Sequence, residues 1–515
     1  MTFFNAPTDR VDLFIVGGGI NGVGIARDAA GRGHKVFLAE QSDLAGATSS
    51  SSTKLIHGGL RYLEQFEFRL VHEALAERER LLGIAPHIIR PMQFVVPHLR
   101  GLRPRWQIRA GLFIYDHLAA RRRLPASRSV RLTDGPFAGI LKDSLRYGFS
   151  YADCWVDDSR LVVLNAMDAA QRGAVIRTRT RFIEAAVESD HWKVRLHDEA
   201  SDTSYEVIAR TLVNAAGPWV EQVLHRMRGV HNDAQIRLVK GSHIVVPRLY
   251  CGDHAFLLQH PDGRVIFTIP YEDEFTLIGT TDVPCSDPPA AARISTAEIE
   301  YLCNTVNEYF ARSIGPQDVR WSYAGVRPLS DDEAANASKV TRDYKLELLI
   351  EDDRPPLLSI FGGKITTYRR LAEAALQKLH PYIGGPKQSW TDAAPLPGGD
   401  LPQGDFDAFL RGVQHRWPFL PPTLTRRLAH AYGTRISEIV GAARSMEDLG
   451  IHFGAGLTRA EVDYLRNHEW ALSVEDILWR RTKLGLHLSD SGRAELARYV
   501  GDRATTATRE RVDTA

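Results

Sequence analysis

The sequence predicts an α/β fold followed by an all-helical C-terminal part. Its first 40 residues combine an apolar strand, a glycine-rich turn, a helical stretch and a second apolar strand. Residues 395–404 are rich in Pro and Gly, which is typical of a linker between domains. Beyond this linker, apolar and charged residues alternate with helical spacing in residues 424–431, 459–467 and 474–483.

Composition places the chain among ordinary globular proteins. It has 515 residues, of which 44% are hydrophobic and 25% charged, so about two to four domains are expected. Lys plus Arg number 64 and Asp plus Glu number 63, and this balance predicts no general attraction to nucleic acid. The four cysteines occur singly, without Cys-x-x-Cys pairs, and predict no metal site.

Membrane insertion and secretion are not predicted. The longest stretch without a charged residue is the 14 residues between Asp12 and Arg27, fewer than the roughly 20 apolar residues that cross a bilayer. The N-terminus has no basic leader followed by an apolar run, so it does not resemble a secretory signal. We therefore expect the chain to stay in the cytosol.

The strongest local pattern is a strand–glycine–helix unit at the N-terminus. Residues 11–16 form the short apolar run of a buried parallel strand. Gly17, Gly19 and Gly22 satisfy the pattern G-x-G-x-x-G, and residues 25–30 begin a helix. Glycines at these positions permit a tight turn, close approach of the backbone to a pyrophosphate and close helix packing. This unit predicts a dinucleotide site, and the alternative is a glycine-rich turn without a ligand.

The residues after this unit favour FAD as the dinucleotide. Residues 36–38 form the second strand, and Glu40 at its end is placed to accept hydrogen bonds from an adenosine ribose. An acidic residue there also disfavours a 2′-phosphate. The unit itself does not distinguish FAD from NAD, but residues 45–64 form a long polar and glycine-rich segment suited to lining a bound cofactor.

The chain contains, in this order, the blocks ATSSSSTKLIHGGLRYLE (47–64), YADCWVDDSRL (151–161), LVNAAGPWV (212–220), KGSHIVVPR (240–248), IGTTD (278–282), GVRPL (325–329), TRDY (341–344), FGGKITTYRRLAE (361–373) and HEWALSVEDILWRRTKLG (468–485). In sequence and in order, these blocks resemble those of the aerobic, respiratory type of FAD-dependent glycerol-3-phosphate dehydrogenase. The resemblance covers nearly the whole chain.

This resemblance implies three domains. The first is a glutathione-reductase-like, Rossmann-type FAD-binding domain assembled from residues 1–85, 145–225 and 320–394. The second is an antiparallel-sheet substrate domain, or cap, formed by residues 86–144 and 226–319. Residues 395–515 form the third, an all-α C-terminal domain.

The resemblance also implies which residues contact FAD. Gly363 precedes a long helical pattern, so unpaired backbone N–H groups are available there for the flavin. The implied cofactor-binding residues are Gly17, Gly19, Gly22, Glu40, Thr48, Ser49, Lys54, Leu55, Gly217, Gly363, Lys364 and Thr366.

The implied reaction is oxidation of sn-glycerol 3-phosphate to dihydroxyacetone phosphate, with hydride passing from C2 to flavin N5. A phosphate dianion requires cations with fixed donor geometry, which Arg supplies well. A single cation, taken alone, is more often a solvated surface charge, and it is the match to the family blocks that favours a site role for Arg61, Arg327 and Lys364. The implied substrate-binding residues are Arg61, Tyr62, His243, Arg327, Arg342 and Lys364, of which Arg61, Arg327 and Lys364 are also expected to act in catalysis.

The C2 hydroxyl must lose a proton as hydride leaves, and a histidine suits this role. His57 is the first choice for the base because it lies four residues before Arg61 in the glycine-rich segment. His243 in the block GSHIVVP is the alternative.

A basic segment predicts contact with an anionic lipid surface. Between Arg100 and Arg131 there are nine Arg, no Lys and one acidic residue, Asp116, with the apolar run 110–115 and Trp106 among them. The alternative is a helix packed on the protein with a solvated basic edge. The resemblance implies that electrons pass to a membrane quinone, that the chain forms a homodimer, and that it attaches peripherally to the cytoplasmic face of the inner membrane.

The sequence is also compatible with different functions. The related glycerol-3-phosphate oxidases use oxygen, but the chain lacks their long insertion, so quinone is favoured as the acceptor. A D-amino-acid or glycine-type flavin oxidase shares some of the same blocks. A binding module that keeps FAD only for structure and a soluble NAD-linked dehydrogenase fit the N-terminal glycine pattern as well.

Overall fold

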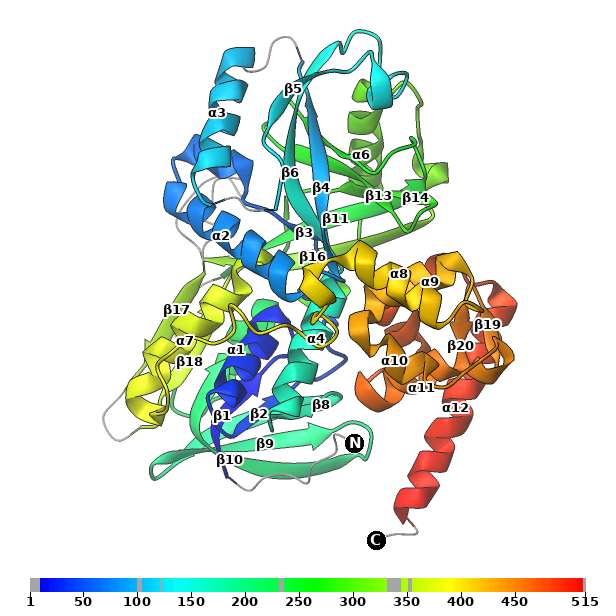
Figure 1. Ribbon diagram of the computed structural model, residues 1–515. Coiled ribbons are helices and arrows are strands. Elements are labelled where there is room, and N and C mark those ends of the chain that lie inside the picture. Colours follow the sequence, from blue (N-terminus) through cyan, green and yellow to red (C-terminus); the bar gives the residue numbers. More distant parts are fainter. Residues whose placement is uncertain are drawn as a thin grey trace.

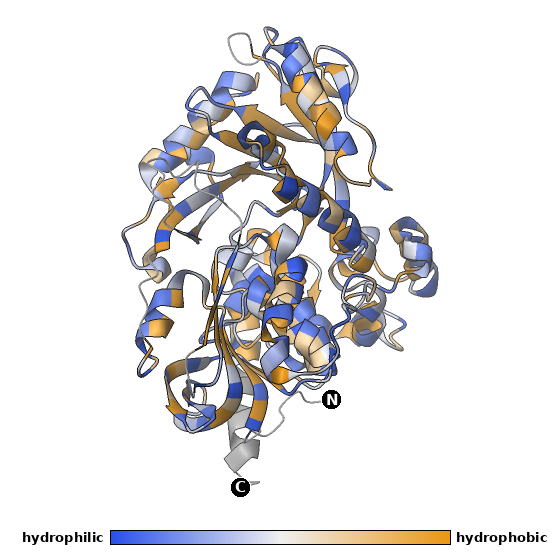
Figure 2. Ribbon diagram, turned by 90° about the vertical axis from the view of Figure 1, so that its left-hand side faces the viewer, coloured by the Kyte–Doolittle hydropathy of each residue, from blue (hydrophilic) through white to orange (hydrophobic). Residues whose placement is uncertain are grey.

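The computed structural model describes residues 10–99, 104–120, 123–230, 236–330, 344–350 and 354–512. Two sheet-based domains lie one above the other in Figure 1, and a helical C-terminal domain packs beside them. In Figure 2 the strands of both sheets are largely hydrophobic, whereas the helices that cover them carry hydrophobic and hydrophilic residues.

The lower domain is built on a mainly parallel sheet. The strands β18, β10, β1, β2 and β7 pair in parallel, and β17 closes one edge in the antiparallel direction. A β8–β9 hairpin extends from the first half of β10. In spatial order the strands are β17 (Lys345–Leu349), β18 (Leu357–Phe361), β10 (Thr203–Asn214), β1 (Arg10–Val16), β2 (Val36–Ala39) and β7 (Val175–Arg177), with β8 (Thr180–Glu188) and β9 (His191–Asp198) beside β10.

Three helices cover one face of this sheet: α1 (Ile20–Gly31), α4 (Asp158–Gln171) and α7 (Tyr368–Ile383). Gly24 permits the close approach of α1 and α7, because a Cβ atom there would lie 2.8 Å from the Tyr368 ring. The β8–β9 hairpin and α5 (Val220–His225) cover the other face around the buried Trp192. The predicted strand–helix–strand unit is therefore confirmed as β1, α1 and β2.

The upper domain contains a ten-stranded sheet that is antiparallel except where β12 and β4 pair in parallel. The helix α6 (Thr296–Tyr309) packs on one face, and α2 (Phe68–Ile84) and α3 (Arg105–His117) pack on the other. In spatial order the strands are β15 (Val283–Pro284), β11 (Ile236–Pro247), β14 (Phe275–Gly279), β13 (Val265–Tyr271), β12 (Ala255–Gln259), β4 (Ile89–Pro97), β6 (Tyr147–Val156) and β3 (Leu55–Ile56), with β16 (Trp321–Ser330) on β11 and β5 (Arg128–Arg131) on β6.

The sheet pairing changes the prediction for three segments. Residues 1–85, 145–225 and 320–394 were expected in the FAD-binding domain, yet β3, β6 and β16 are strands of the upper sheet. β3 pairs with β6, β6 pairs with β4 from Tyr147 to Val156, and β16 pairs with β11 over ten residues. An apolar strand carries no local mark of the sheet it joins, so only the pairing could place these three strands.

The C-terminal domain is mainly helical around its own apolar core. The predicted helical segments 424–431 and 459–467 lie in α9 and α11, and the segment 474–483 contains a π-helix. A small hairpin departs from the all-α prediction. The elements are α8 (Phe406–Arg416), α9 (Pro422–Tyr432), α10 (Ile436–Val440), β19 (His452–Gly454), β20 (Leu457–Thr458), α11 (Arg459–His468), the π-helix Asp476–Arg481 and α12 (Asp490–Val512).

Candidate functional site

A cavity of about 1240 Å³ extends between the two sheet-based domains. Its wall includes Val16 and Ala39, at the carboxyl ends of the parallel strands β1 and β2, and residues of β16 from the upper sheet. Ligands of doubly wound sheets bind at this edge, and the volume exceeds the 300–1,000 Å³ usual for small-molecule sites. The cavity therefore has room for a dinucleotide together with a small substrate.

The glycine turn forms one end of this cavity. Gly17 has φ +111°, and a Cβ atom there would lie 2.5 Å from the Ala215 carbonyl oxygen. Gly19 precedes α1 and supplies no side-chain cap, and the N-terminal end of the helix lies at the cavity end, where the Ile20 N–H donates to Ser49 Oγ. The positive end of the helix suits a pyrophosphate. Gly22 lies behind the described wall, where a Cβ atom would lie 2.0 Å from the Gly17 carbonyl oxygen.

Glu40 lines the cavity and holds the backbone around the turn. Its carboxylate accepts hydrogen bonds from the backbone N–H of Gly18 at 2.7 Å and of Ser42 at 2.9 Å. Burial raises the pKa of the Glu40 carboxyl, and these hydrogen bonds oppose the shift. The contact of Glu40 with an adenosine ribose stays a prediction.

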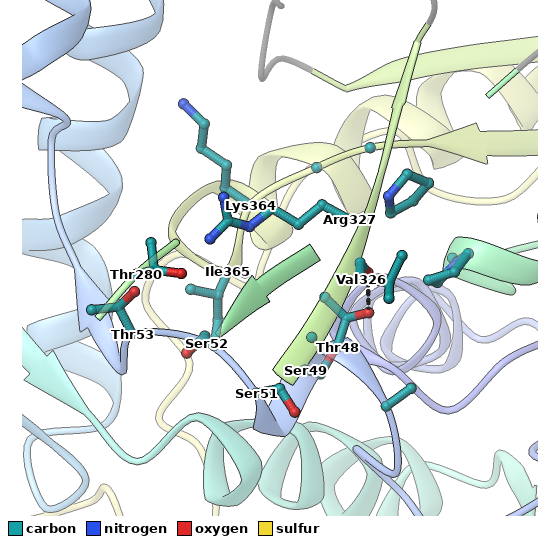
Figure 3. Close-up of a pocket in the computed structure, with 18 of the residues that line it drawn as sticks. Thr48, Ser49, Ser51, Ser52, Thr53, Thr280, Val326, Arg327, Lys364 and Ile365 are labelled. Carbon is teal, nitrogen blue, oxygen red and sulfur yellow. Dashed lines mark hydrogen bonds between the residues drawn. The ribbon is translucent and has the colours of Figure 1, made fainter. Parts of the chain in front are cut away.

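All of the other predicted cofactor residues except Lys54 line the cavity. They are Thr48, Ser49, Leu55, Gly217, Gly363, Lys364 and Thr366. Ser49 Oγ accepts a hydrogen bond from the Ile20 N–H at 3.0 Å, and Thr48 Oγ1 donates to the Val326 carbonyl at 2.6 Å (Figure 3). These contacts join the segment after β2 to α1 and β16.

The prediction that the Lys54 side chain contacts the cofactor is corrected. Its side chain is fully buried, and its Nζ lies 2.8 Å from Asp158 Oδ1, behind the described wall. Its neighbours Thr53 and Leu55 line the cavity, whereas Lys54 has φ +61° and points into the protein. Sequence spacing did not predict this reversal.

Three predicted cations, Arg61, Arg327 and Lys364, lie on the cavity wall. Arg327 Nη1 donates to Asp282 Oδ1 at 2.8 Å, and Lys364 Nζ lies 3.8 Å from the centroid of the Tyr62 ring. Figure 3 shows Arg327 and Lys364 extending toward the same region of the cavity. Together they form a cationic region suited to a phosphate ester.

Gly241 leaves the space that Arg327 occupies. A Cβ atom at this position would lie 3.0 Å from Arg327 Nη2 and 2.7 Å from Thr280 Oγ1. Asp282 and Thr280 were not predicted as site residues, although both lie in the block IGTTD. The sequence feature that could have indicated them is a threonine followed two residues later by a carboxylate, at the end of an apolar strand.

The two candidate bases differ in position. His57 lines the cavity, and its backbone N–H donates to Thr366 Oγ1 at 3.3 Å. His243 is fully buried behind the described wall, stacked on Tyr323, with Nε2 3.0 Å from Thr53 Oγ1. Burial, together with the charges of Arg327 and Lys54, holds the pKa of His243 well below 6.5. The prediction that His243 contacts substrate is therefore corrected, and Arg342 lies outside the described residues.

An exposed apolar patch lies on the upper domain, beside the turn that carries Arg61. We define the aromatic patch as Phe66, Phe68, Trp106, Phe113 and Ile114, all exposed; Trp106 is 73% exposed and Phe66 79%. The last three lie on α3, which packs beside the turn that ends at Gln65. No helix within the described ranges is both long and apolar enough to cross a membrane.

Comparison with known proteins places this architecture in a class. The profile of the family "FAD dependent oxidoreductase" matches residues 12–369, and that of the "C-terminal domain of alpha-glycerophosphate oxidase" matches residues 389–503. The X-ray structure of a glycerol-3-phosphate dehydrogenase from Bacillus halodurans complexed with FAD superimposes with a TM-score of 0.76 and 26% identity, covering 99% of this chain and 95% of that one. The fold and the cavity are those of an FAD-dependent oxidoreductase, and FAD is the cofactor.

Sequence relatives narrow the class. A glycerol-3-phosphate dehydrogenase of Pseudomonas aeruginosa is 53% identical over 96% of both chains. The aerobic glycerol-3-phosphate dehydrogenase of Escherichia coli is 48% identical over 95% of this chain and 97% of that one. A D-erythritol 1-phosphate dehydrogenase of Brucella abortus is also 48% identical, over 96% of this chain and 98% of that one. The chain belongs to the family of FAD-dependent glycerol-3-phosphate dehydrogenases.

Proposed function

We propose that this protein oxidises sn-glycerol 3-phosphate to dihydroxyacetone phosphate. The observation that carries the proposal is one cavity in which the glycine turn at α1 is continuous with the cations Arg61, Arg327 and Lys364. FAD, when bound, supplies the acceptor for two electrons. The names of the sequence relatives support the same substrate.

The residues of the glycine turn fit the adenosine half of FAD. The N–H groups of Gly19 and of the first turn of α1 would bind the pyrophosphate, and the Glu40 carboxylate would accept from the ribose. Thr48, Ser49 and Leu55 would line the middle of the cofactor, with Gly217 opposite. The backbone of Gly363 and Thr366 would contact the flavin ring.

The cations bind and orient the substrate. Arg61, Arg327 and Lys364 hold the phosphate, and Tyr62 fixes the Lys364 ammonium against its ring. A cation facing C2 also stabilises the alkoxide that forms as the hydroxyl loses its proton. Asp282 holds Arg327 in place and partly offsets its charge.

His57 accepts the proton of the C2 hydroxyl at a ring nitrogen. It is the candidate base on the described cavity wall, and the Thr366 hydroxyl fixes its backbone. His243 is a neutral ring behind the cavity wall, and its Nε2 holds the Thr53 side chain by a hydrogen bond with Oγ1.

Anaerobic bleaching of the bound flavin tests the substrate. We expect glycerol 3-phosphate to bleach the flavin and glycine or D-amino acids to leave it yellow. D-Erythritol 1-phosphate belongs in the same assay, because a relative named for it is as similar as the E. coli enzyme. Faster bleaching by erythritol phosphate or by an amino acid overturns the proposed substrate.

A membrane quinone is the proposed electron acceptor, and the aromatic patch is the proposed lipid contact. Aromatic residues on the same helix as Arg105 and Arg109 suit an anionic interface, where each cation contributes about 1 kcal/mol. The double substitution Trp106→Ser/Phe113→Ser should release the protein from phosphatidylglycerol vesicles. Ile451→Ser, at an exposed apolar residue of the C-terminal domain, is the matched control. Equal vesicle binding by all three proteins refutes the assignment.

Rapid mixing identifies the acceptor: the anaerobically reduced protein should reoxidise with quinone and only slowly with oxygen. We further propose, from the family resemblance, a homodimer attached peripherally to the cytoplasmic face of the inner membrane. Sedimentation of the detergent-solubilised protein tests the dimer, and a monomer at every concentration contradicts it.

A further inference from the structure

The C-terminal domain contacts the segment that follows β2 but contributes no residue to the described wall of the cavity. Every residue of the described cavity wall lies between Val16 and Thr366. The π-helix Asp476–Arg481 nevertheless packs against the segment that follows β2, whose residues Glu40, Gln41, Ser42, Ala45 and Gly46 line the cavity. The contact is made at Asp43, in the middle of this segment.

Asp43 is held by two arginines of the π-helix. Arg481 donates from Nη1 and Nη2 to the two carboxylate oxygens of Asp43 at 2.7 and 2.8 Å, and Arg480 donates from Nε. Arg481 is fully buried and Asp43 is 1% exposed. The Glu469 carbonyl accepts two further hydrogen bonds from Arg481. This two-pronged geometry is the most directional that an ion pair adopts.

The backbone around Asp43 transmits its position to the cavity wall. The Gly46 N–H donates to the Asp43 carbonyl at 2.9 Å, and the Ala45 N–H donates to the Gly18 carbonyl at 3.1 Å. Ala45 has φ +57°, a conformation that costs a non-glycine residue about 1 kcal/mol or more. Because the turn is strained, it needs contacts from outside to keep its shape.

A second contact from the same π-helix reaches the segment. Asp476 accepts from Arg179 Nη2 at 2.7 Å, and the Arg179 backbone N–H donates to the Ser42 carbonyl at 2.9 Å. The π-helix therefore holds the turn on both sides, at Asp43 and through Arg179 at Ser42.

We propose that Arg481 is a positioning residue for FAD, and that one function of the C-terminal domain is to hold the 40–46 turn in its FAD-binding shape. The inference rests on the proposed placement of the adenosine half of FAD beside Glu40. It predicts that loss of the Arg481–Asp43 pair weakens FAD binding, while the substrate concentration required by the FAD-saturated enzyme stays the same.

Release of FAD from diluted holoenzyme, followed by flavin fluorescence, measures the effect. Arg481→Lys retains the charge and loses the paired geometry, so the dissociation constant of FAD should rise about tenfold. Asp43→Asn should give a similar rise, and the double variant should be little worse than either single one. Asp43→Asn also decides the matter if Arg481→Lys does not fold.

Arg427→Lys is the matched control. Arg427 forms the same two-pronged pair with Glu461, at 2.7 Å on both sides, wholly within the C-terminal domain. Its FAD affinity should equal that of the unaltered protein. The proposal is refuted if Arg481→Lys keeps normal FAD affinity, or if Arg427→Lys weakens FAD binding as much.

Gly19→Val tests the underlying placement of FAD. A Cβ atom at Gly19 lies 3.2 Å from Ser49 Oγ at the cavity end, and the larger side chain should abolish FAD binding. Retention of FAD by this variant refutes the proposed cofactor site itself. Loss of FAD by Gly19→Val with normal affinity in Arg481→Lys refutes only the role of the C-terminal domain.

Discussion

The substitution Arg327→Met tests the phosphate site most directly. It removes a cation whose guanidinium faces the cavity and donates to Asp282 at 2.8 Å. A hydrogen bond to a charged group contributes about 1.5–3 kcal/mol, so losing one such bond to the phosphate corresponds to about 10- to 150-fold in affinity. The Asp282 side chain is 8% exposed, and when Arg327 is removed its negative charge beside the phosphate is no longer offset by that guanidinium. Both effects raise the substrate concentration that half-saturates reduction of the flavin.

The assay is anaerobic single-turnover reduction of the bound flavin over a range of glycerol 3-phosphate concentrations. We expect the half-saturating concentration to rise by about 10- to 150-fold. The double variant Arg327→Met/Asp282→Asn should recover part of this loss, because it removes the negative charge of the Asp282 carboxylate. Slow reduction by glycerol, which carries no phosphate, should be the same in all three proteins. An unchanged concentration dependence in Arg327→Met refutes the phosphate assignment.

Three further predictions concern buried or wall-lining groups. His57→Gln should slow flavin reduction by about 10²–10⁴-fold while FAD content stays normal, and an unchanged rate removes His57 from the role of base. Lys54→Met should lower the free energy of unfolding in urea by about 3–5 kcal/mol, because it leaves Asp158 buried without its cation; a loss of FAD with normal stability contradicts this structural role. Burial alone would raise the pKa of Asp476, but Arg179, Arg480 and Arg481 lower it from 3.8 to about 2. Its contribution of about 2 kcal/mol is therefore complete above about pH 4 and lost as the pH falls to about 2. The difference in unfolding free energy between the unaltered protein and Asp476→Asn should shrink over this range, and a constant difference contradicts the assignment.

The cofactor cradle was predictable because its geometry is local. Gly17, Gly19 and Glu40 lie within 24 residues of one another, and their roles follow from backbone conformation and strand order. The cations of the cavity came from family blocks, and three of the four cations predicted for the phosphate lie on the described wall. The prediction for Lys54 was wrong because the direction of a side chain within a turn depends on the backbone angles there, which neighbouring residue types do not reveal.

The sequence by itself determined that a dinucleotide cradle stands at the N-terminus, since a glycine pattern and a strand end act over a few residues. Only the tertiary structure decided which sheet receives β6 and β16, which carboxylate restrains Arg327, and that His243 lies behind the cavity wall. The pairing of Asp43 with Arg481 spans 438 positions of the chain. Such contacts are chosen by the packing of whole domains, so no local pattern in the sequence carries them.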